Sequence, residues 1–215
     1  MITGQEHRRT GALGHAVKGP VGIVIATRFE AAPILKAFHF RQKEKNIYEA
    51  ASNGTQMYLA ICGAGIEPAR RAAHKLCDLG AKELISAGFC GALSESLKAG
   101  DLVTDRIATV AKPVLTQGDR RALSEKAGAQ AADMETQAVV EAGTRRGVPI
   151  HMLRVVSDTF DDDLSELIGP TEHFSRWRIA LRLWNPKLWP LALRLRRQSK
   201  VAHQRLVQAL IEYLK

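Results

Sequence analysis

Apolar residues in this chain gather in short runs, and segments with helical periodicity lie between them. Four runs have the length and composition of buried strands and cover residues 21–26, 56–61, 84–87 and 150–156. A shorter strand is expected at residues 100–103. The expected helices begin near residue 29 and cover residues 68–79 and 136–146. Strands that alternate with helices in this way predict an α/β fold built on an open sheet.

Two glycine-rich segments directly follow two of these expected strands. The first is Gly63-Ala64-Gly65, and the second covers residues 88–93 and contains Gly88 and Gly91. We expect both to be turns that let the backbone approach a ligand closely. The third glycine of the dinucleotide-binding fingerprint is missing, because residues 70–73 contain none. The pattern therefore argues against a Rossmann cofactor site.

Acidic residues lie where the expected strands end. Glu30 follows the first strand, Asp158 follows the last, and Asp133 and Glu135 precede the helix at residues 136–146. In an open α/β sheet the carboxyl ends of strands meet at one crevice, so these carboxylates predict acid/base or sugar-binding chemistry. A plainer alternative stays open, in which Glu30 and Asp133 serve helix N-termini and Glu135 is exposed.

The composition fits one large domain that folds without disulfide bonds or structural metal ions. The chain has 215 residues, of which 46% are hydrophobic. Its three cysteines form neither a CxxC pair nor a zinc-like set, so we expect a reducing, cytoplasmic environment and no metal site. We expect no membrane span and no signal peptide, and we expect residues 1–18 to be a loose arm before a domain at residues 19–215.

The positive charge is concentrated in the last part of the chain. The formal net charge is +9, and residues 174–215 hold ten Lys or Arg against a single acid, Glu212. All three tryptophans, Trp177, Trp184 and Trp189, lie in the same segment. This basic tail suggests peripheral contact with a membrane surface. The alternative is that residues 201–214 form an ordinary amphipathic terminal helix, which packs on the sheet or at a dimer interface. Nucleic-acid binding is a weaker alternative.

Six motifs, taken in order, resemble the nucleoside phosphorylase and methylthioadenosine/adenosylhomocysteine nucleosidase superfamily over about residues 20–162. The motifs lie at residues 22–30, 63–65, 88–93, 100–103, 133–135 and 154–158. The resemblance implies a single-domain, three-layer α/β/α sandwich with a central mixed, mostly parallel sheet. It also implies a nucleoside substrate, no cofactor and a homodimer.

The resemblance further implies a role for each matched residue. Glu30 would activate a water molecule, which favours hydrolysis over phosphorolysis, and Asp158 would protonate the leaving purine. Glu135 would bind the ribose hydroxyls, with Met134 packed beneath the sugar. Phe89 stands where family phosphorylases tend to place a phosphate-binding serine. The whole implied substrate-binding set is Ala64, Gly65, Gly88, Phe89, Asp133, Met134, Glu135 and Ser157.

Finer features resemble the hopanoid-associated branch of this superfamily, which is thought to remove adenine from adenosylhopane. They are residues 115–119 and 127–136, together with the arginine-rich tail. The small Ala64 suggests a wide pocket for a bulky 5′ group. The segment between Asp101 and Asp133 is shorter than family members usually carry, so a phosphate-dependent reaction and a degenerate membrane-binding or partner-binding member remain alternatives.

Overall fold

The structure is a computed structural model that describes residues 19–169, 182 and 184–215. The expected arm at residues 1–18 and part of the basic tail lie outside these residues. The described strands are β1 (Val21–Ile25), β2 (Arg41–Glu44), β3 (Ile47–Ser52), β4 (Thr55–Ile61), β5 (Glu83–Ala92), β6 (Leu102–Val103), β7 (Ile107–Thr109), β8 (Ala131–Asp133) and β9 (Ile150–Asp158). The helices are α1 (Arg28–Ala37), α2 (Ile66–Asp78), α3 (Gln117–Ala127), α4 (Thr136–Arg145), α5 (Ser165–Ile168), the 3-10 helix η1 (Pro186–Leu188) and α7 (Trp189–Tyr213).

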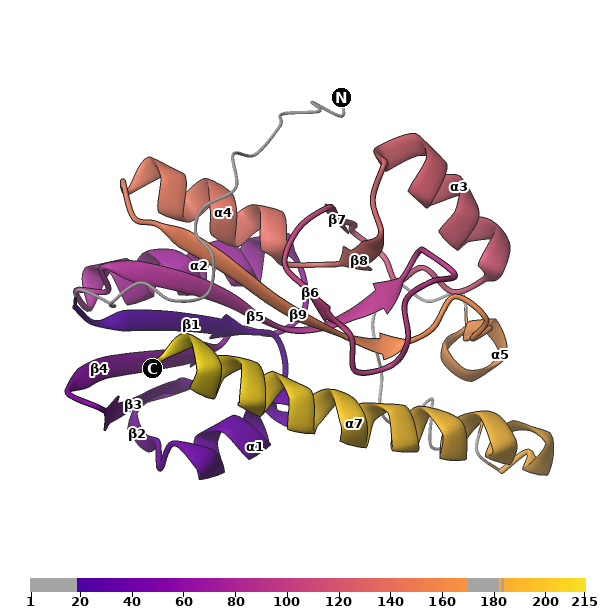
Figure 1. Ribbon diagram of the computed structural model, residues 1–215, viewed down its shortest axis with the longest axis horizontal. Helices are drawn as coiled ribbons and strands as arrows, with labels where there is room; N and C mark the ends of the chain where they lie inside the picture. Colours follow the sequence, from indigo (N-terminus) through magenta and orange to yellow (C-terminus); the bar gives the residue numbers. More distant parts are fainter. Residues whose placement is uncertain (1–18, 170–181, 183) are drawn as a thin grey trace.

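The described strands form one sheet of nine strands (Figure 1). Its order is β2-β3-β4-β1-β5-β8-β7, and β9 pairs with β5 and with β6. The central strands β4, β1, β5 and β9 run parallel to one another, whereas β2, β3 and β6 add antiparallel pairs at the edges. This confirms the expected α/β class with a mixed sheet that is parallel at its centre.

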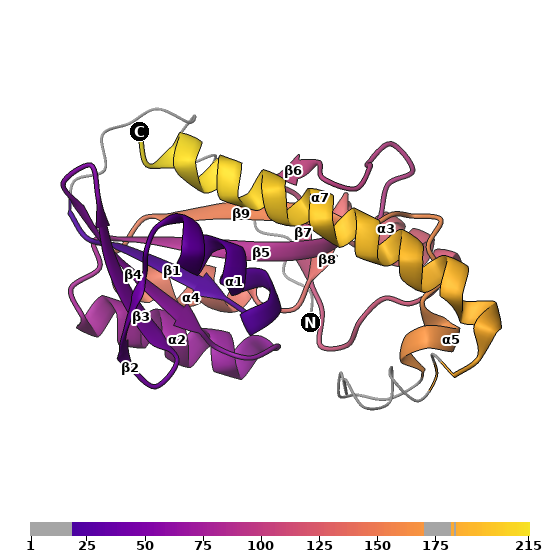
Figure 2. The same ribbon diagram turned by 90° about the horizontal axis from the view of Figure 1, so that it is seen from below.

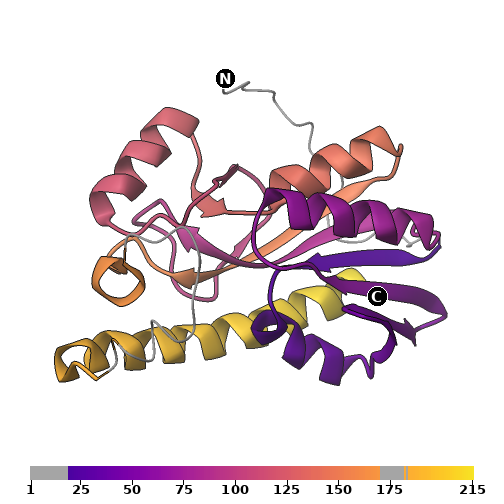
Figure 3. The same cartoon turned by 180° about the vertical axis from the view of Figure 1, so that it is seen from behind.

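Helices cover both faces of the sheet (Figures 1 and 2). Because side chains alternate along a strand, Ile23 and Ile25 of β1 join the core beneath α1 and α7, whereas Val24 joins the core beneath α2 and α4. Figure 3 shows α2 and α4 side by side on their face, and α7 on the other. The expected three-layer sandwich is therefore confirmed.

The structure corrects the expected glycine turn at residues 88–93. These residues are not a turn, because β5 continues through them to Ala92. Residues 108–131, which show little pattern in the sequence, hold β7, α3 and the start of β8. Helix α3 escaped sequence prediction because its only buried residue is the charged Arg120, so it lacks an apolar stripe.

The expected terminal amphipathic helix is present and is longer than its apolar pattern predicts. Helix α7 has 25 residues, and its buried side chains are Ala202, Leu206, Ala209, Leu210 and Tyr213. Only its second half therefore packs on the sheet, as predicted for residues 201–214. Within the described residues, no helix has the length and apolar character needed to cross a membrane.

Candidate active site

A buried arginine, Arg154, lies at the centre of the site. Its side chain is 1% exposed on β9, and its Nη2 lies 2.8 Å from Asp133 Oδ2. Its Nη1 lies 3.5 Å from Glu135 Oε2. Burial by itself lowers the pKa of this guanidinium, but the charges of Asp133, Glu135 and Glu30 outweigh it and raise the pKa. Arg154 is therefore a permanent cation held among three carboxylates.

Two hydroxyl groups complete the setting of Arg154. Its Nη2 donates to Ser86 Oγ at 2.9 Å, and its Nε donates to Thr136 Oγ1 at 3.1 Å. A charged side chain that is buried in the sheet needs such partners, since buried N–H groups without hydrogen bonds lower the stability of the fold. The sequence-derived site set omitted Arg154, although a lone charge inside the apolar run of residues 150–156 was a usable signal.

Glu30 serves the start of α1, as the plainer alternative expected, and it also contacts β5. Its Oε2 accepts hydrogen bonds from the backbone N and Oγ1 of Thr27, at 2.9 and 2.6 Å, which closes a capping box at the start of α1. Its Oε1 accepts from the Phe89 backbone N at 2.8 Å. A Cβ on Gly88 would lie 2.8 Å from both Glu30 Oε1 and Arg154 Nη1. Glycine at position 88 therefore allows the acid and the arginine to lie against β5.

Glu135 meets the glycine loop that precedes α2. Its Oε1 accepts a hydrogen bond from the Gly65 backbone N at 2.9 Å, and Glu135 is only 5% exposed. Gly65 adopts φ +108°, a conformation that glycine takes without strain. Burial raises the pKa of Glu135, and the nearby Arg154 offsets part of that rise. The predicted convergence of the loop at residues 63–65 with Glu135 is thus present in the structure.

Both carboxylate oxygens of Asp133 contact donors of the protein itself. Its Oδ1 accepts from Thr109 Oγ1 at 2.8 Å, and its Oδ2 accepts from the backbone N and Oγ1 of Thr136 and pairs with Arg154. Its side chain is fully buried. Asp133 therefore serves the start of α4, as the plainer alternative expected, although the N-cap residue is Glu135, and Asp133 also holds Arg154 in place. The same alternative is wrong for Glu135, which is buried and not exposed.

Asp158 lies at the far end of the site, in contact with a second buried arginine. Its Oδ2 lies 2.6 Å from Arg120 Nη2, and its Oδ1 accepts from Ser157 Oγ at 2.8 Å. The Arg120 side chain is fully buried and also donates to Ala92 O at 2.9 Å. Burial raises the pKa of Asp158, while Arg120 and the Ser157 hydroxyl lower it in part. No feature of the sequence marked Arg120.

A register shift brings Asp158 to its place beside β5. Cys90 pairs with Val156, but the next residue, Gly91, pairs with Asp158. A Cβ on Gly91 would lie 2.8 Å from Asp158 Oδ2. Gly88 and Gly91 are three residues apart, which corresponds to about 10 Å along a strand. Glu30, which lies against Gly88 and Phe89, and Asp158, which lies beside Gly91, therefore meet β5 at separate positions.

Three rings from separate elements lie together beside Glu30. The rings of Phe29 and His203 are 4.6 Å apart, and those of Phe89 and His203 are 4.9 Å apart. The Nε2 atom of His203 lies 2.9 Å from Phe29 O, which ties α7 to the start of α1. Phe29 is nevertheless 62% exposed. This aromatic group, which the sequence did not reveal, offers an apolar surface next to the acid.

The remaining expected site residues differ in exposure. Ala64 is exposed, and Met134, Phe89 and Ser157 are half-buried.

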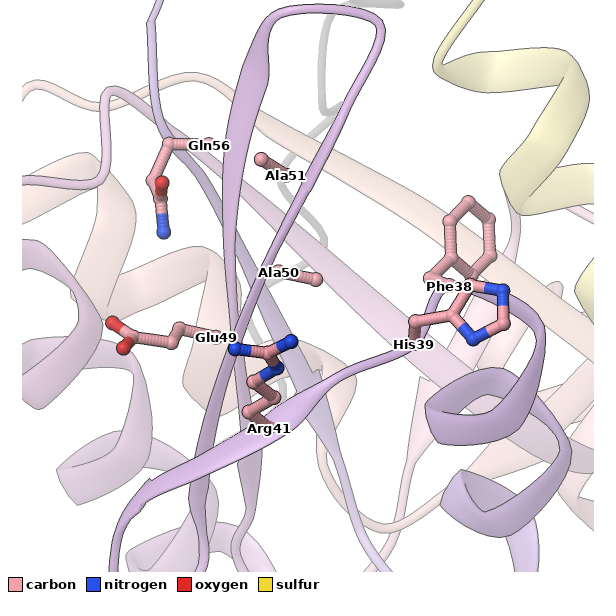
Figure 4. Close-up of a pocket in the computed structure, with 7 residues that line it drawn as sticks. All are labelled: Phe38, His39, Arg41, Glu49, Ala50, Ala51 and Gln56. Atoms are coloured by element: carbon pink, nitrogen blue, oxygen red, sulfur yellow. The ribbon is translucent and has the colours of Figure 1, made fainter.

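Two surface hollows lie away from these residues. One is lined by residues of β2, β3 and β4 and by the end of α1 (Figure 4), and the other is lined by residues that include Arg182, Trp184 and Leu188. Within the described part of the chain, no group of three or more His, Cys, Asp or Glu residues could hold a metal ion.

Replacing Arg154 by methionine is expected to lower the free energy of unfolding by about 3–5 kcal/mol, because it leaves buried carboxylates without their cation. Urea unfolding followed by circular dichroism measures this difference. The matched control is Arg196→Met on the exposed face of α7, which should change stability by about 0.5 kcal/mol or less. Equal effects of the two variants would contradict a structural role for Arg154.

Comparisons with known proteins identify a family and similar folds. A family model described as the phosphorylase superfamily matches residues 20–104 and 105–177. Curated protein sequences give no match. Solved structures supply similar folds at low sequence identity, as three examples show.

The 5′-methylthioadenosine/S-adenosylhomocysteine nucleosidase of Neisseria meningitidis, in complex with methylthio-immucillin-A, has a TM-score of 0.69 and 16% identity, and the match covers 92% of this chain and 99% of that one. The corresponding nucleosidase of S. pneumoniae, with a transition-state inhibitor, has a TM-score of 0.68 and 16% identity over 91% and 98% of the two chains. Futalosine hydrolase of Helicobacter pylori has a TM-score of 0.68 and 15% identity over 91% and 97%.

Proposed function

Because the chain belongs to the phosphorylase superfamily, we propose that it hydrolyses the N-glycosidic bond of an adenosyl compound with a bulky 5′ substituent and releases adenine. One observation carries the proposal: carboxylates cluster around Arg154 at one end of the site, and Asp158 stands at the other end. The similar structures named above are nucleosidases and a futalosine hydrolase, which supports the same chemistry.

The arrangement suits the charge that develops during this reaction. As the bond between C1′ and the base nitrogen breaks, the sugar becomes oxocarbenium-like and the electron pair goes to the base. Glu135 and Glu30, together with Asp133, supply negative charge for the sugar end. Asp158 donates a proton to the base, and Glu30 accepts a proton from the water whose oxygen bonds to C1′. The raised pKa of Asp158 helps it to stay protonated.

Water is favoured over phosphate as the nucleophile. A phosphate needs free cationic or hydroxyl donors, but the arginines that contact these carboxylates, Arg154 and Arg120, are already ion-paired. The side chain of Phe89 offers no donor. The three carboxylates around one cation also repel an anion. A phosphorylase remains the second candidate, and its signature is turnover that requires phosphate.

The aromatic group beside Glu30 supports an apolar 5′ substituent. Phe29, Phe89 and His203 form a surface that gains free energy by covering apolar atoms. Ala64, in the loop that contacts Glu135, is small and exposed. Adenosylhopane, the substrate type of the hopanoid-associated branch that the sequence resembles, has a substituent of this kind. It is our specific candidate for the substrate.

The test is adenine release from a panel of adenosines with 5′ groups that range from hydroxyl to long alkyl, with and without phosphate. We expect release without phosphate and a kcat/KM that rises with the apolar 5′ group. Phe29→Ala should reduce that preference about tenfold, whereas Ile211→Ala, an exposed apolar residue on α7, should not. Release only with phosphate would establish the phosphorylase instead, and no release from any substrate would favour a degenerate binding module.

Two proposals about the setting of the enzyme accompany this function. We expect a homodimer in the cytoplasm, with peripheral contact to the inner face of the membrane through the basic tail. Sedimentation velocity of the purified chain measures the oligomeric state. A monomer at every concentration would contradict the dimer.

A further inference from the structure

The first half of α7 and the turn before it carry apolar side chains that face solvent. Trp184 is 86% exposed, Trp189 is 55% exposed and Leu193 is 53% exposed. These three residues are called the apolar tip. Folded proteins seldom expose tryptophan to this extent, since each ring carries a large apolar area. Figure 2 shows this end of α7 beside α5, beyond the part of the helix that lies along β9.

Cations are frequent in the segment that carries the apolar tip, although the acid Glu166 of α5 lines a hollow together with Trp184. Residues 182–200 contain six Lys or Arg and no acid. Two of these cations have structural tasks: Arg182 donates to the carbonyl groups of α5, and Arg194 Nε lies 2.9 Å from Asp162 Oδ1. Three others follow the tip along α7 and are called the basic row: Arg196, Arg197 and Lys200. They are exposed, and none of them forms an ion pair with an acid in the described part of the chain.

Trp189, Leu193 and the basic row share one face of α7, whereas Trp184 lies in the turn before the helix. Positions three or four apart lie on the same side of an α-helix, which aligns Trp189 with Leu193, and Leu193 with Arg196 and Arg197. Lys200 continues the row one turn later. The opposite side of α7 supplies Arg194, and Gln198 Nε2, which donates to Asp162 Oδ2 at 3.1 Å. The exposed face is therefore held in a fixed orientation and is not turned toward the protein.

We propose that this face docks the protein on the surface of an anionic lipid bilayer. Tryptophan and leucine gain free energy by entering the boundary between headgroups and acyl chains, and arginine and lysine one turn behind them meet the anionic headgroups. Charge complementarity selects the anionic surface, because the face has only cations. A nucleic acid would satisfy the cations but would leave the apolar tip in water.

The helix that carries this face is attached to the candidate active site from its other side. Asp162, which Arg194 and Gln198 bind from α7, also accepts from the Thr159 backbone N at 2.7 Å. Thr159 directly follows Asp158. The docking face is thus fastened to the loop that follows the proposed acid. The inference itself does not depend on the nucleosidase activity, since lipid binding and adenine release are measured separately.

The test is co-sedimentation of the full chain with vesicles of phosphatidylcholine plus phosphatidylglycerol, and with vesicles of phosphatidylcholine alone. We expect binding to the anionic vesicles, a blue shift of tryptophan emission, and loss of binding at high salt. The tip variant is Trp184→Ser, Trp189→Ser, Leu193→Gln, and the row variant is Arg196→Gln, Arg197→Gln, Lys200→Gln. The row variant should bind about 100-fold more weakly, at about a factor of five per lost cation. The tip variant should lose the emission shift and at least tenfold of the binding.

The matched control is Ile211→Ser, which removes an exposed apolar residue from the other end of the same helix and should leave vesicle binding unchanged. Far-UV circular dichroism and thermal unfolding confirm that each variant is folded. Three results would overturn the proposal: no binding to either vesicle, equal binding of the wild-type chain and both variants, or binding of an RNA oligonucleotide in place of vesicles. A dimer that the tip variant dissociates, without vesicle binding, would overturn it in favour of a second copy of the chain.

Discussion

Replacing Glu30 by glutamine is expected to lower kcat/KM for adenine release by about 10²–10⁴, the usual range for removal of a general base. Glutamine keeps the size of the side chain and a carbonyl oxygen that still accepts from the Phe89 backbone N–H, as Glu30 Oε1 does at 2.8 Å. It cannot accept the proton of the attacking water. The measurement is the initial rate of adenine release at saturating and at low substrate, which separates kcat from kcat/KM.

The control for this prediction is the same substitution in a buried acid at the opposite end of β5. Glu83 is 7% exposed and lies at the first position of that strand, whereas Glu30 contacts β5 at Phe89, near its other end. Glu83→Gln should leave kcat/KM within about twofold while testing how the fold tolerates loss of a buried charge. If both variants lost activity equally, the loss would reflect folding, and Glu30 would not be the base.

Much of the fold follows from the sequence because its central strands are fully buried. Runs of apolar residues at 21–26, 56–61 and 150–156 contain β1, most of β4 and most of β9. Helices α2 and α4 were predicted from their periodicity and from the glycines that follow them. The carboxyl-terminal half of β5 was missed, since glycine is unfavourable inside strands and is typical of turns. The reason for Gly88 and Gly91 lies in side chains from α1, α3 and β9 that cross β5 there.

The candidate site was predictable where its residues follow strands, and unpredictable where they arrive from distant helices. Glu30, Glu135 and Asp158 could be named because strand ends converge in an α/β sheet. Arg120 and His203 come from α3 and α7, and only the tertiary fold brings them to the carboxyl end of β5. A sequence pattern reports periodicity along the chain, whereas these contacts span 28 residues or more.

Helix α7 contributes to the hydrophobic core, to the aromatic group beside Glu30 and to the proposed membrane face. Its second half fills the core with Leu206 and Leu210, and His203 joins the aromatic group beside Glu30. Its first half fastens Asp162 and presents the proposed membrane face. Helix α7 is therefore packed into the fold, and its His203 lies beside the candidate site.

Replacing Asp158 by asparagine is expected to reduce kcat for adenine release by about 10²–10⁴, because asparagine has no proton to give to the departing base. The wild-type rate should fall as the pH rises through the pKa of Asp158, which burial raises above its ordinary value, since only the protonated acid donates. The Asp158→Asn variant should lack that descending limb. Profiles of kcat/KM against pH for both proteins measure the effect.

Replacing Arg120 tests this prediction most directly, because Arg120 lowers the pKa of Asp158. The guanidinium lies 2.6 Å from Asp158 Oδ2 and opposes the rise of its pKa. The Arg120→Gln variant lacks this positive charge, so the pKa of Asp158 should rise further. The descending limb of the profile of kcat/KM against pH should then move to higher pH. Arg121→Gln, a neighbour on the exposed side of α3 that pairs with Glu95, should not move it. A limb that stayed in place in Arg120→Gln, or survived in Asp158→Asn, would assign the proton to another group.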